Sequence, residues 1–241
     1  MALDEARTES DTAADHVTDH NTLHAQHNVI VDSWFGNLLR RPSTETVDAE
    51  DDEFDDASID AAWTNQYAGT APTWTESHGR LYLSAAGEAG TNDKTQTIPV
   101  PGSGDWEYEV CVTASLAPTD NYAKPAYMCV IEGTTAQKLA LIGITSYGDH
   151  TQLVTNLHTS YSLYSGLLSA NTSYDRHGIH FLRIKKTGTT YDFSYSTDSV
   201  SWITHYSGTL TFVPTEVGVG GTPEQTVGPI SAAFEYIRRI S

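Results

Sequence analysis

The chain has 241 residues, 39% of them hydrophobic, a composition typical of a globular protein. It holds 31 Asp and Glu against 13 Lys and Arg, a formal charge of −18. This charge argues against a nucleic-acid-binding surface, which needs basic residues, and against electrostatic attachment to an anionic membrane. Since all-β domains often run to about 200 residues, we expect one main domain with an extension.

The acidity is concentrated near the start of the chain. Residues 1–60 hold 16 of the acidic residues and three of the basic ones, so residues 61–241 are only mildly acidic. We find no apolar run of about 18 residues and therefore expect no membrane span. The polar start of the sequence does not resemble a secretory signal peptide.

Residues 1–46 lack the alternation of apolar and polar residues that is typical of strands. We predict that they form a helical arm for docking or oligomerisation. Apolar and histidine residues follow steps of three and four, which place them on one helical face: Ala13, His16, His20, Leu23, His27, Ile30 and Trp34. Two His pairs at a spacing of four could share zinc on a helix. The metalloprotease motif needs Glu after the first His, but Val17 and Asn21 stand there. We therefore interpret these histidines as interface residues and predict no metal ligand.

Residues 47–56 are predicted to form an acidic linker, because seven of the nine residues from Asp48 to Asp56 are acidic. A solvated connector explains this run, and the alternative is a calcium site, since calcium prefers carboxylate oxygens. The spacing does not match an EF-hand loop. We therefore predict no cofactor.

Residues 57–241 predict a mainly β domain, because short alternating runs are separated by turns that contain Pro and Gly. In Trp106–Val112, the aromatic Trp106 and Tyr108 share one face of the strand, and Glu107 and Glu109 point to the opposite, solvent side. Further strands are expected at Arg80–Ser84, Tyr127–Ile131, Leu139–Ile144, Leu153–Leu157, His180–Lys185, Tyr191–Ser196, Trp202–Tyr206, Val217–Gly220 and Ala232–Ile237. Without long helical patterns between them, these strands predict an antiparallel sandwich.

Several short cues follow one another in a familiar order: Phe54–Asp56 with Ile59–Trp63, Gly79–Leu83, Gly104–Glu109, Tyr191–Trp202 and Ala232–Tyr236. Together they resemble concanavalin A-like (laminin G-like) jelly-roll domains, and this resemblance implies an antiparallel jelly-roll β-sandwich. The sequence departs from the pattern at Ser199, where family members often carry glycine.

A second resemblance covers about ten residues, Asp19–Asn28. The run D-H-N-T-L-H-A-Q-H-N resembles a signature near the start of many tailed-phage virion proteins. It implies attachment to a virus particle. We assign docking or oligomer contacts to the residues of this arm: His16, His20, Asn21, Leu23, His24, His27, Asn28 and Trp34.

The sequence offers little support for catalysis. Some concanavalin A-like enzymes cleave glycans with paired carboxylates. Glu107 and Glu109 share a strand face, but Tyr108 stands where the central Asp of that motif would be, and the third acid is missing. Motifs for a nucleophilic serine or cysteine, and for a phosphate loop, are also lacking. The two cysteines, Cys111 and Cys129, are expected to be buried, with a bridge between neighbouring strands as the alternative.

Aromatic residues beside Asp and Asn are typical of glycan-binding surfaces. We predict such a surface at three loop or edge positions: Asp120, Asn121 and Tyr122; Tyr147 and Asp149; Tyr161 and Tyr164. Most other aromatic residues are expected in the core.

The sequence thus predicts a non-enzymatic virion structural protein. Its arm would dock on other virion proteins, as a homo-oligomer such as a trimer, and its lectin-like sandwich would face outward. That domain would decorate the capsid or, in a minor tail protein or tail fibre, adhere to host-surface glycans. The alternative is a glycan-cleaving enzyme or a free carbohydrate-binding module. We expect the protein to be made in the host cytoplasm and to reside on the particle surface.

Overall fold

A computed structural model describes residues 51–115, 123–133, 137–147, 150–174, 180–223 and 229–240. The predicted helical arm, residues 1–46, lies outside the described residues, as does the linker up to residue 50. The compact unit to which the described residues belong begins at Asp48.

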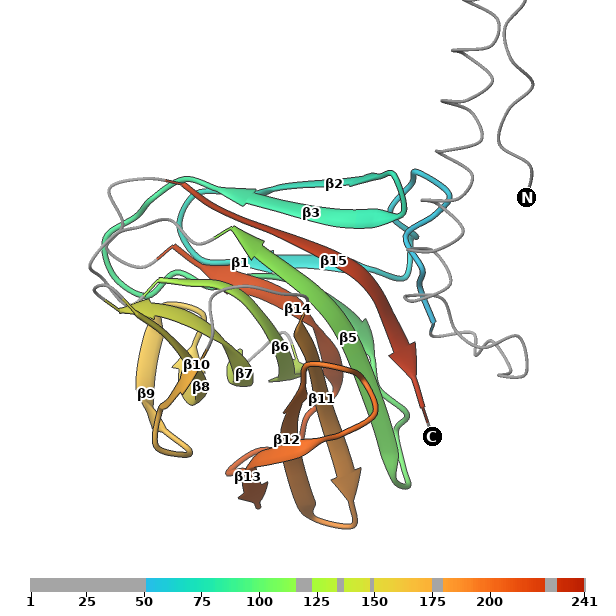
Figure 1. The fold of residues 1–241 in the computed structure, drawn as a ribbon, viewed down its shortest axis with the longest axis vertical. Helices are drawn as coiled ribbons and strands as arrows, with labels where there is room; N and C mark the ends of the chain where they lie inside the picture. The colour runs from blue at the N-terminus through green and yellow to red at the C-terminus, as the bar shows by residue number, and fades with distance from the viewer. Residues whose placement is uncertain are drawn as a thin grey trace, which may run out of the picture. The chain divides into compact units, whose positions relative to one another are not determined.

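The described residues form two antiparallel sheets packed face to face (Figure 1), which confirms the predicted jelly-roll β-sandwich. Sheet A has seven strands, in the order β13 (Ile203–Gly208), β12 (Thr190–Ser196), β11 (His180–Thr187), β5 (Trp106–Ser115), β15 (Ile230–Arg239), β3 (Arg80–Ala85) and β2 (Thr73–Ser77). Sheet B has eight strands, in the order β1 (Thr64–Tyr67), β4 (Lys94–Pro99), β14 (Glu216–Thr222), β6 (Lys124–Glu132), β7 (Lys138–Tyr147), β8 (His150–Ser160) and β10 (Thr172–Tyr174), with β9 (Leu163–Leu167) also paired to β8.

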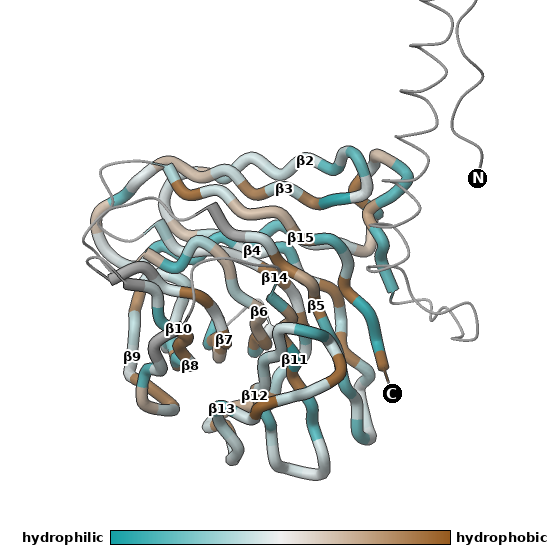
Figure 2. Tube along the Cα trace, viewed as in Figure 1, coloured by the Kyte–Doolittle hydropathy of each residue, from teal (hydrophilic) through white to brown (hydrophobic). Residues whose placement is uncertain are grey.

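The core lies between the sheets and is built from the alternation along each strand, which Figure 2 shows as a change of hydropathy from residue to residue. In β5, Trp106 and Tyr108 point into this core and are at most 1% exposed. Glu107 and Glu109 point to the opposite face, as expected. However, each is only 6% exposed, so the prediction that they face solvent is wrong.

The sequence did not predict five of the strands, namely β1, β2, β4, β9 and β10. These are short or polar segments, such as Thr-Asn-Gln-Tyr in β1 and Lys-Thr-Gln-Thr-Ile-Pro in β4. Such segments lack apolar alternation and become strands because their backbone groups pair with a neighbour. A tight turn joins the two strands expected at His180–Lys185 and Tyr191–Ser196, with Gly188 at a positive φ of 59° between β11 and β12.

Both cysteines are free and buried. Cys111 lies on the outer face of sheet A, and Cys129 lies on the outer face of sheet B. The whole sandwich separates them, so the expectation of buried cysteines is confirmed and the alternative of a bridge is wrong.

Sheet B folds over its own outer face. His158 on β8 contacts Asp93, which directly precedes β4, although β14, β6 and β7 lie between those strands. In a flat sheet, strands four places apart would be roughly 19 Å apart. A second apolar cluster fills the fold: Tyr127, Cys129, Ile131, Leu139, Leu141, Val154 and Tyr161. The outer face of sheet B is therefore a closed second core.

Glycines in β14 make room for this second core. A Cβ on Gly220 would lie 2.4 Å from the Lys94 carbonyl oxygen and 2.6 Å from the Tyr127 ring. On the other side of that tyrosine, a Cβ on Gly143 would lie 2.4 Å from the Tyr127 Cβ. Gly218 and Gly221 of the same strand are packed as closely, since a Cβ there would lie 2.0 Å from the Gln96 carbonyl oxygen and 2.7 Å from Ile230 Cδ1. Glycines also let a sheet bend sharply, as sheet B does.

Among the described residues, no helix has the length and the apolar character needed to cross a membrane.

Candidate functional site

The residues predicted for an exposed glycan surface differ in their exposure in the structure. Tyr161 is 1% exposed, so its prediction as part of an exposed surface is wrong. Tyr164 is 41% exposed on the edge strand β9, as expected. Tyr147 is the last residue of β7. Asp120, Asn121, Tyr122 and Asp149 lie outside the described residues.

Tyr161 is buried because it closes the second core. It lies in the turn between β8 and β9, and its hydroxyl donates to Gln66 Oε1 on β1 over 2.6 Å. Its carbonyl accepts from the Asp93 amide over 2.8 Å. Burial raises the pKa of its phenol above the usual range. A turn position suggested exposure, but the folding of sheet B brings this turn against β1 and β4.

Sequence analysis did not predict the buried polar group around Asp93 and His158. The Asp93 Oδ2 atom lies 2.5 Å from His158 Nδ1, and neither side chain is exposed. Asp93 Oδ1 accepts from Thr222 Oγ1 over 2.6 Å and from the Tyr127 hydroxyl over 3.3 Å. The only signal in the sequence was a histidine that continues the strand pattern after Leu153–Leu157.

Two atoms of β8 in this second core have unused hydrogen-bonding capacity. His158 Nε2 and Asn156 Oδ1 are buried and have no hydrogen-bond partner among the described residues. Their residues are two positions apart on one strand and therefore point to the same face of sheet B. Buried polar atoms usually find a partner, so such a pair identifies a place to look for a ligand.

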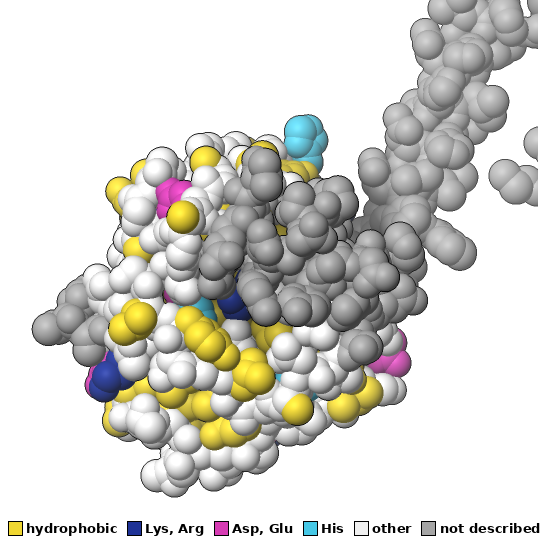
Figure 3. Space-filling view, turned by 90° about the vertical axis from the view of Figure 1, so that its left-hand side faces the viewer, with side chains coloured by type: hydrophobic (Ala, Val, Ile, Leu, Met, Phe, Trp, Pro, Cys, Tyr) yellow, Lys and Arg dark blue, Asp and Glu magenta, His cyan; other side chains and the backbone are white. Residues whose placement is uncertain are grey.

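Tyr164 lies directly beside His158. The two rings meet edge to face, with centroids 5.6 Å apart, and the Lys124 ammonium lies 6.0 Å from the Tyr164 centroid. Leu163 and Leu167 on the same strand are 59% and 52% exposed. Figure 3 shows the side of the molecule on which β9 lies, where hydrophobic side chains are spread over the surface with few charged ones among them. We call Leu163, Tyr164 and Leu167 the β9 surface.

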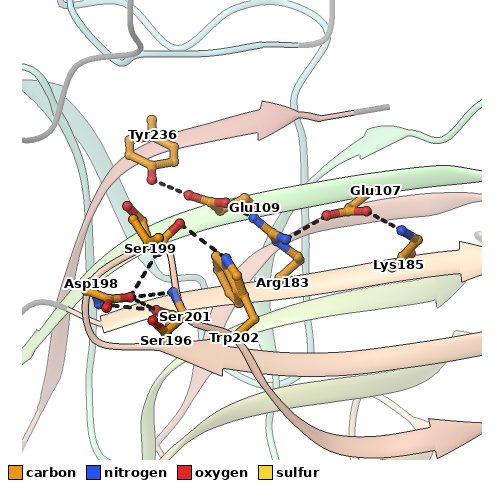
Figure 4. Close-up of polar contacts among 11 residues, drawn as sticks. Glu107, Glu109, Arg183, Lys185, Ser196, Asp198, Ser199, Ser201, Trp202 and Tyr236 are labelled. Atoms are coloured by element: carbon orange, nitrogen blue, oxygen red, sulfur yellow. Dashed lines mark hydrogen bonds and ion pairs between the residues drawn. The ribbon is translucent and has the colours of Figure 1, made fainter.

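The outer face of sheet A carries a row of paired charges (Figure 4). Arg183 on β11 joins both glutamates of β5, over 2.8 Å to Glu107 and 2.7 Å to Glu109. Lys185 also pairs with Glu107 over 2.9 Å, and the Tyr236 hydroxyl donates to Glu109 over 2.6 Å. The register explains the row, because Arg183 lies opposite Glu109 and Lys185 lies opposite Glu107.

A loop before β13 covers part of this row. The Trp202 ring lies over the Arg183 guanidinium, 3.6 Å from its carbon, and its indole N–H donates to the Ser199 carbonyl. Asp198 Oδ1 accepts from the amides of Val200 and Ser201. These hydrogen bonds hold the pKa of the Asp198 carboxyl well below its usual range. Ser199 has a φ of 57°, the left-handed conformation that glycine adopts most readily.

This arrangement does not suit glycoside hydrolysis by Glu107 and Glu109. A glycosidase needs one carboxyl group that stays protonated to act as an acid, and this requires an environment that raises its pKa. Both glutamates instead form ion pairs with Arg183, and Glu107 also pairs with Lys185, so their oxygens are occupied. Among the described residues, moreover, no three His, Cys, Asp or Glu side chains are grouped so as to hold a metal ion.

Comparisons with known proteins identify the fold of the chain but do not assign it to a family. No family model and no curated protein matches the chain. Among solved structures, the chain is similar to the GH43 protein BlXynB from Bacillus licheniformis, with 16% identity and a TM-score of 0.62, over 83% of this chain and 40% of that one. The chain thus corresponds to less than half the length of that protein.

Two other structures match over nearly their whole length. A functionally unknown protein from Saccharomyces cerevisiae has 15% identity and a TM-score of 0.53, over 72% of this chain and 95% of that one. SCLam, a non-specific endo-β-1,3(4)-glucanase of family GH16, has 14% identity and a TM-score of 0.52, over 83% and 92%. At these identities the likeness defines a concanavalin A-like β-sandwich and nothing finer.

The predicted docking residues lie outside the described residues. These are His16, His20, Asn21, Leu23, His24, His27, Asn28 and Trp34. Their role stays a prediction from the sequence.

Proposed function

We propose that the β-sandwich binds a carbohydrate at the β9 surface and does not cleave it. One observation carries this proposal: an exposed tyrosine, Tyr164, lies on the edge strand β9 between two exposed leucines, and its ring is held edge to face against the buried His158. Sugar rings stack on aromatic faces such as the one that Tyr164 presents.

The composition of β9 also suits a neutral ligand. The strand Leu-Tyr-Ser-Gly-Leu has no charged residue, and ligand sites are mostly apolar with a few placed polar groups. Solved structures with this fold include proteins described as glycoside hydrolases, which act on carbohydrates. That likeness is one of fold, and it supports the ligand class only as an analogy.

At two places, the outer face of sheet A and the second core, the contacts of the carboxylates favour binding over cleavage. Glu107 and Glu109 are paired with cations on the outer face of sheet A. In the second core, Asp93 accepts from His158, Thr222 and Tyr127. Glu216 there accepts from Gln66 and Thr97. None of these four groups is left open to donate a proton to a glycosidic oxygen.

We further propose that residues 1–46 attach the domain to a virus particle. The support is the run Asp19–Asn28 and its resemblance to a tailed-phage virion signature. Attached copies would present many weak glycan sites at once, so that millimolar single-site affinities could still give firm adhesion. Capsid decoration and tail-based host adhesion both fit this arrangement.

A glycan array probed with the full chain tests the binding proposal. We expect retention on one glycan class, and loss of that retention in Tyr164→Ala. Tyr67→Ala is the matched control, because Tyr67 is 44% exposed on a different strand, β1, and should not affect binding. Mass analysis of the glycan after incubation should show the intact ligand. Cleavage products, or equal binding by both variants, would refute the proposal.

The particle proposal needs a separate test. Antibody labelling of the sandwich domain on purified particles should locate it on the shell or on the tail. A chain that is absent from purified particles would refute the virion role and leave the carbohydrate proposal standing.

A further inference from the structure

The segment Asp51–Trp63, which we call the junction loop, connects the acidic N-terminal part of the chain to the sandwich. It is tied to β15 at Asp52, whose backbone N–H and C=O both pair with Ile237 over 2.9 Å. A hydrogen bond also joins the two ends of the loop, since the Trp63 indole N–H donates to Asp52 Oδ2 over 2.6 Å. The start of the loop is therefore fixed to sheet A and to the end of the loop.

One carboxyl group of sheet A holds the middle of this loop. Glu76 on β2 is 6% exposed, and its Oε1 accepts from the Ala57 amide over 2.9 Å. Ala57 has a φ of 66°, and Phe54 has a φ of 51°. Such left-handed conformations cost free energy in residues other than glycine, so contacts such as the one to Glu76 are needed to maintain them.

The second oxygen of the Glu76 carboxyl group lacks a hydrogen-bond donor in the described part of the chain. Glu76 Oε2 is buried and accepts from no donor among the described residues. The Glu76 side chain contacts that of Asp56, and the charge of Asp52 also acts on Glu76. Two carboxylate oxygens in contact repel each other unless a proton or a cation lies between them.

The described residues supply no cation for this pair. On β3, Arg80 is paired with Glu235, and on β15, Arg238 is paired with Glu53. Across the strand pair, Glu76 lies opposite the apolar Leu81. The charged groups that act on Glu76 are thus Asp52 and Asp56, both negative. No group of described side chains has the arrangement of a metal site either.

We propose that Glu76 and Asp56 share one proton and that this proton fastens the junction loop to sheet A. At low pH the shared proton gives a hydrogen bond between the two carboxyl groups. At high pH both groups are ionised, the contact becomes repulsive, and the loop loosens from β2. Burial, reinforced by Asp56 and Asp52, raises the pKa of Glu76 to about 7, which places the transition near neutral pH.

Hydrogen exchange of the full chain tests this proposal. Protection factors for residues 51–63, corrected for the intrinsic rate, would be measured from pH 5.5 to 8.5 in buffer with EDTA. We expect protection to fall by up to about tenfold for each pH unit between 5.5 and 7, where the closed loop binds one proton more than the open loop, and to level off above pH 7. In Glu76→Gln, the amide can donate permanently to Asp56 and accept from Ala57. Protection should then be independent of pH.

A matched control separates this pair from general charge repulsion. Asp55→Asn removes the same charge from an exposed neighbour in the loop and should keep the wild-type pH dependence. Protection that does not change with pH in the wild type would overturn the proposal. So would restoration of protection at pH 8 by 1 mM calcium or magnesium, since a cation and not a proton would then hold the pair.

Discussion

At the scale of single residues, Ser199 is held in a conformation that its side chain disfavours. Its φ of 57° fits the place where domains with this hairpin often carry glycine. The left-handed conformation costs roughly 1 kcal/mol for a residue with a Cβ, and the greater freedom of glycine in the unfolded chain offsets part of the gain. We expect Ser199→Gly to raise the free energy of unfolding by about 0.5 kcal/mol in urea denaturation.

The neighbour Ser201 provides the comparison. Its amide also donates to Asp198, but it is not in the left-handed region. Ser201→Gly should therefore lower the free energy of unfolding slightly. Equal effects of the two substitutions would show that the φ of Ser199 does not matter.

Glu76 makes the stability of the domain depend on pH. Its pKa in the folded chain is about 7, against 4.5 for the ordinary group, so the folded state binds more protons between these values. This stabilising contribution is present below about pH 4.5 and is lost as pH rises through 7. We expect Glu76→Gln to flatten this part of the profile, by about 1–3 kcal/mol between pH 5 and 8. Urea denaturation at each pH measures it, and an unchanged slope would contradict the account.

At the scale of the elements, the bend of sheet B depends on β14. Gly220→Ala would push a methyl group against the Lys94 carbonyl oxygen and the Tyr127 ring. Overpacking of this kind costs roughly 1–3 kcal/mol. We expect thermal denaturation to show a clear drop in the melting temperature.

Gly166 on β9 is the control for this change. A Cβ at Gly166 meets no atom within 4 Å, so Gly166→Ala should leave stability unchanged or slightly raised. If both variants lost the same stability, intrinsic strand propensity would explain the effect and close packing around Tyr127 would not.

The alternation of apolar and polar residues was enough to predict the central strands and the sandwich. In β5 it separated the core residues Trp106 and Tyr108 from Glu107 and Glu109. It could not predict that those glutamates are buried, because their burial depends on cations from β11 that lie 74 or more positions away in sequence. Polar strands such as β4 were missed, since only their partners make them strands.

The candidate site was harder to predict than the fold. Exposure of Tyr164 follows from its place on an edge strand, but the burial of Tyr161 follows from the folding of sheet B over itself. Asp93 and His158 are 65 positions apart, and no local pattern joins them. The glycines of β14 were the one local signal of the bend, and their meaning became specific only with the position of Tyr127.

At the scale of the whole molecule, a histidine-containing arm precedes the β-sandwich in the sequence. Four of the ten histidines lie between residues 16 and 27. If they face one another between copies of the arm, protonation near pH 6.5 should weaken the assembly. We expect sedimentation of the full chain to show an oligomer at pH 7.5 that dissociates at pH 5. An assembly of the same size at both pH values would count against contacts between the histidines of neighbouring copies.

The central claim is that a carbohydrate binds beside Tyr164 on β9. The most direct test is hydrogen exchange of the full chain with and without a glycan selected on the array. We expect protection to increase in β9 and in the adjoining end of β8, and to stay unchanged on the outer face of sheet A around Trp202. Protection confined to the Trp202 face, or no change anywhere at saturating glycan, would contradict the claim.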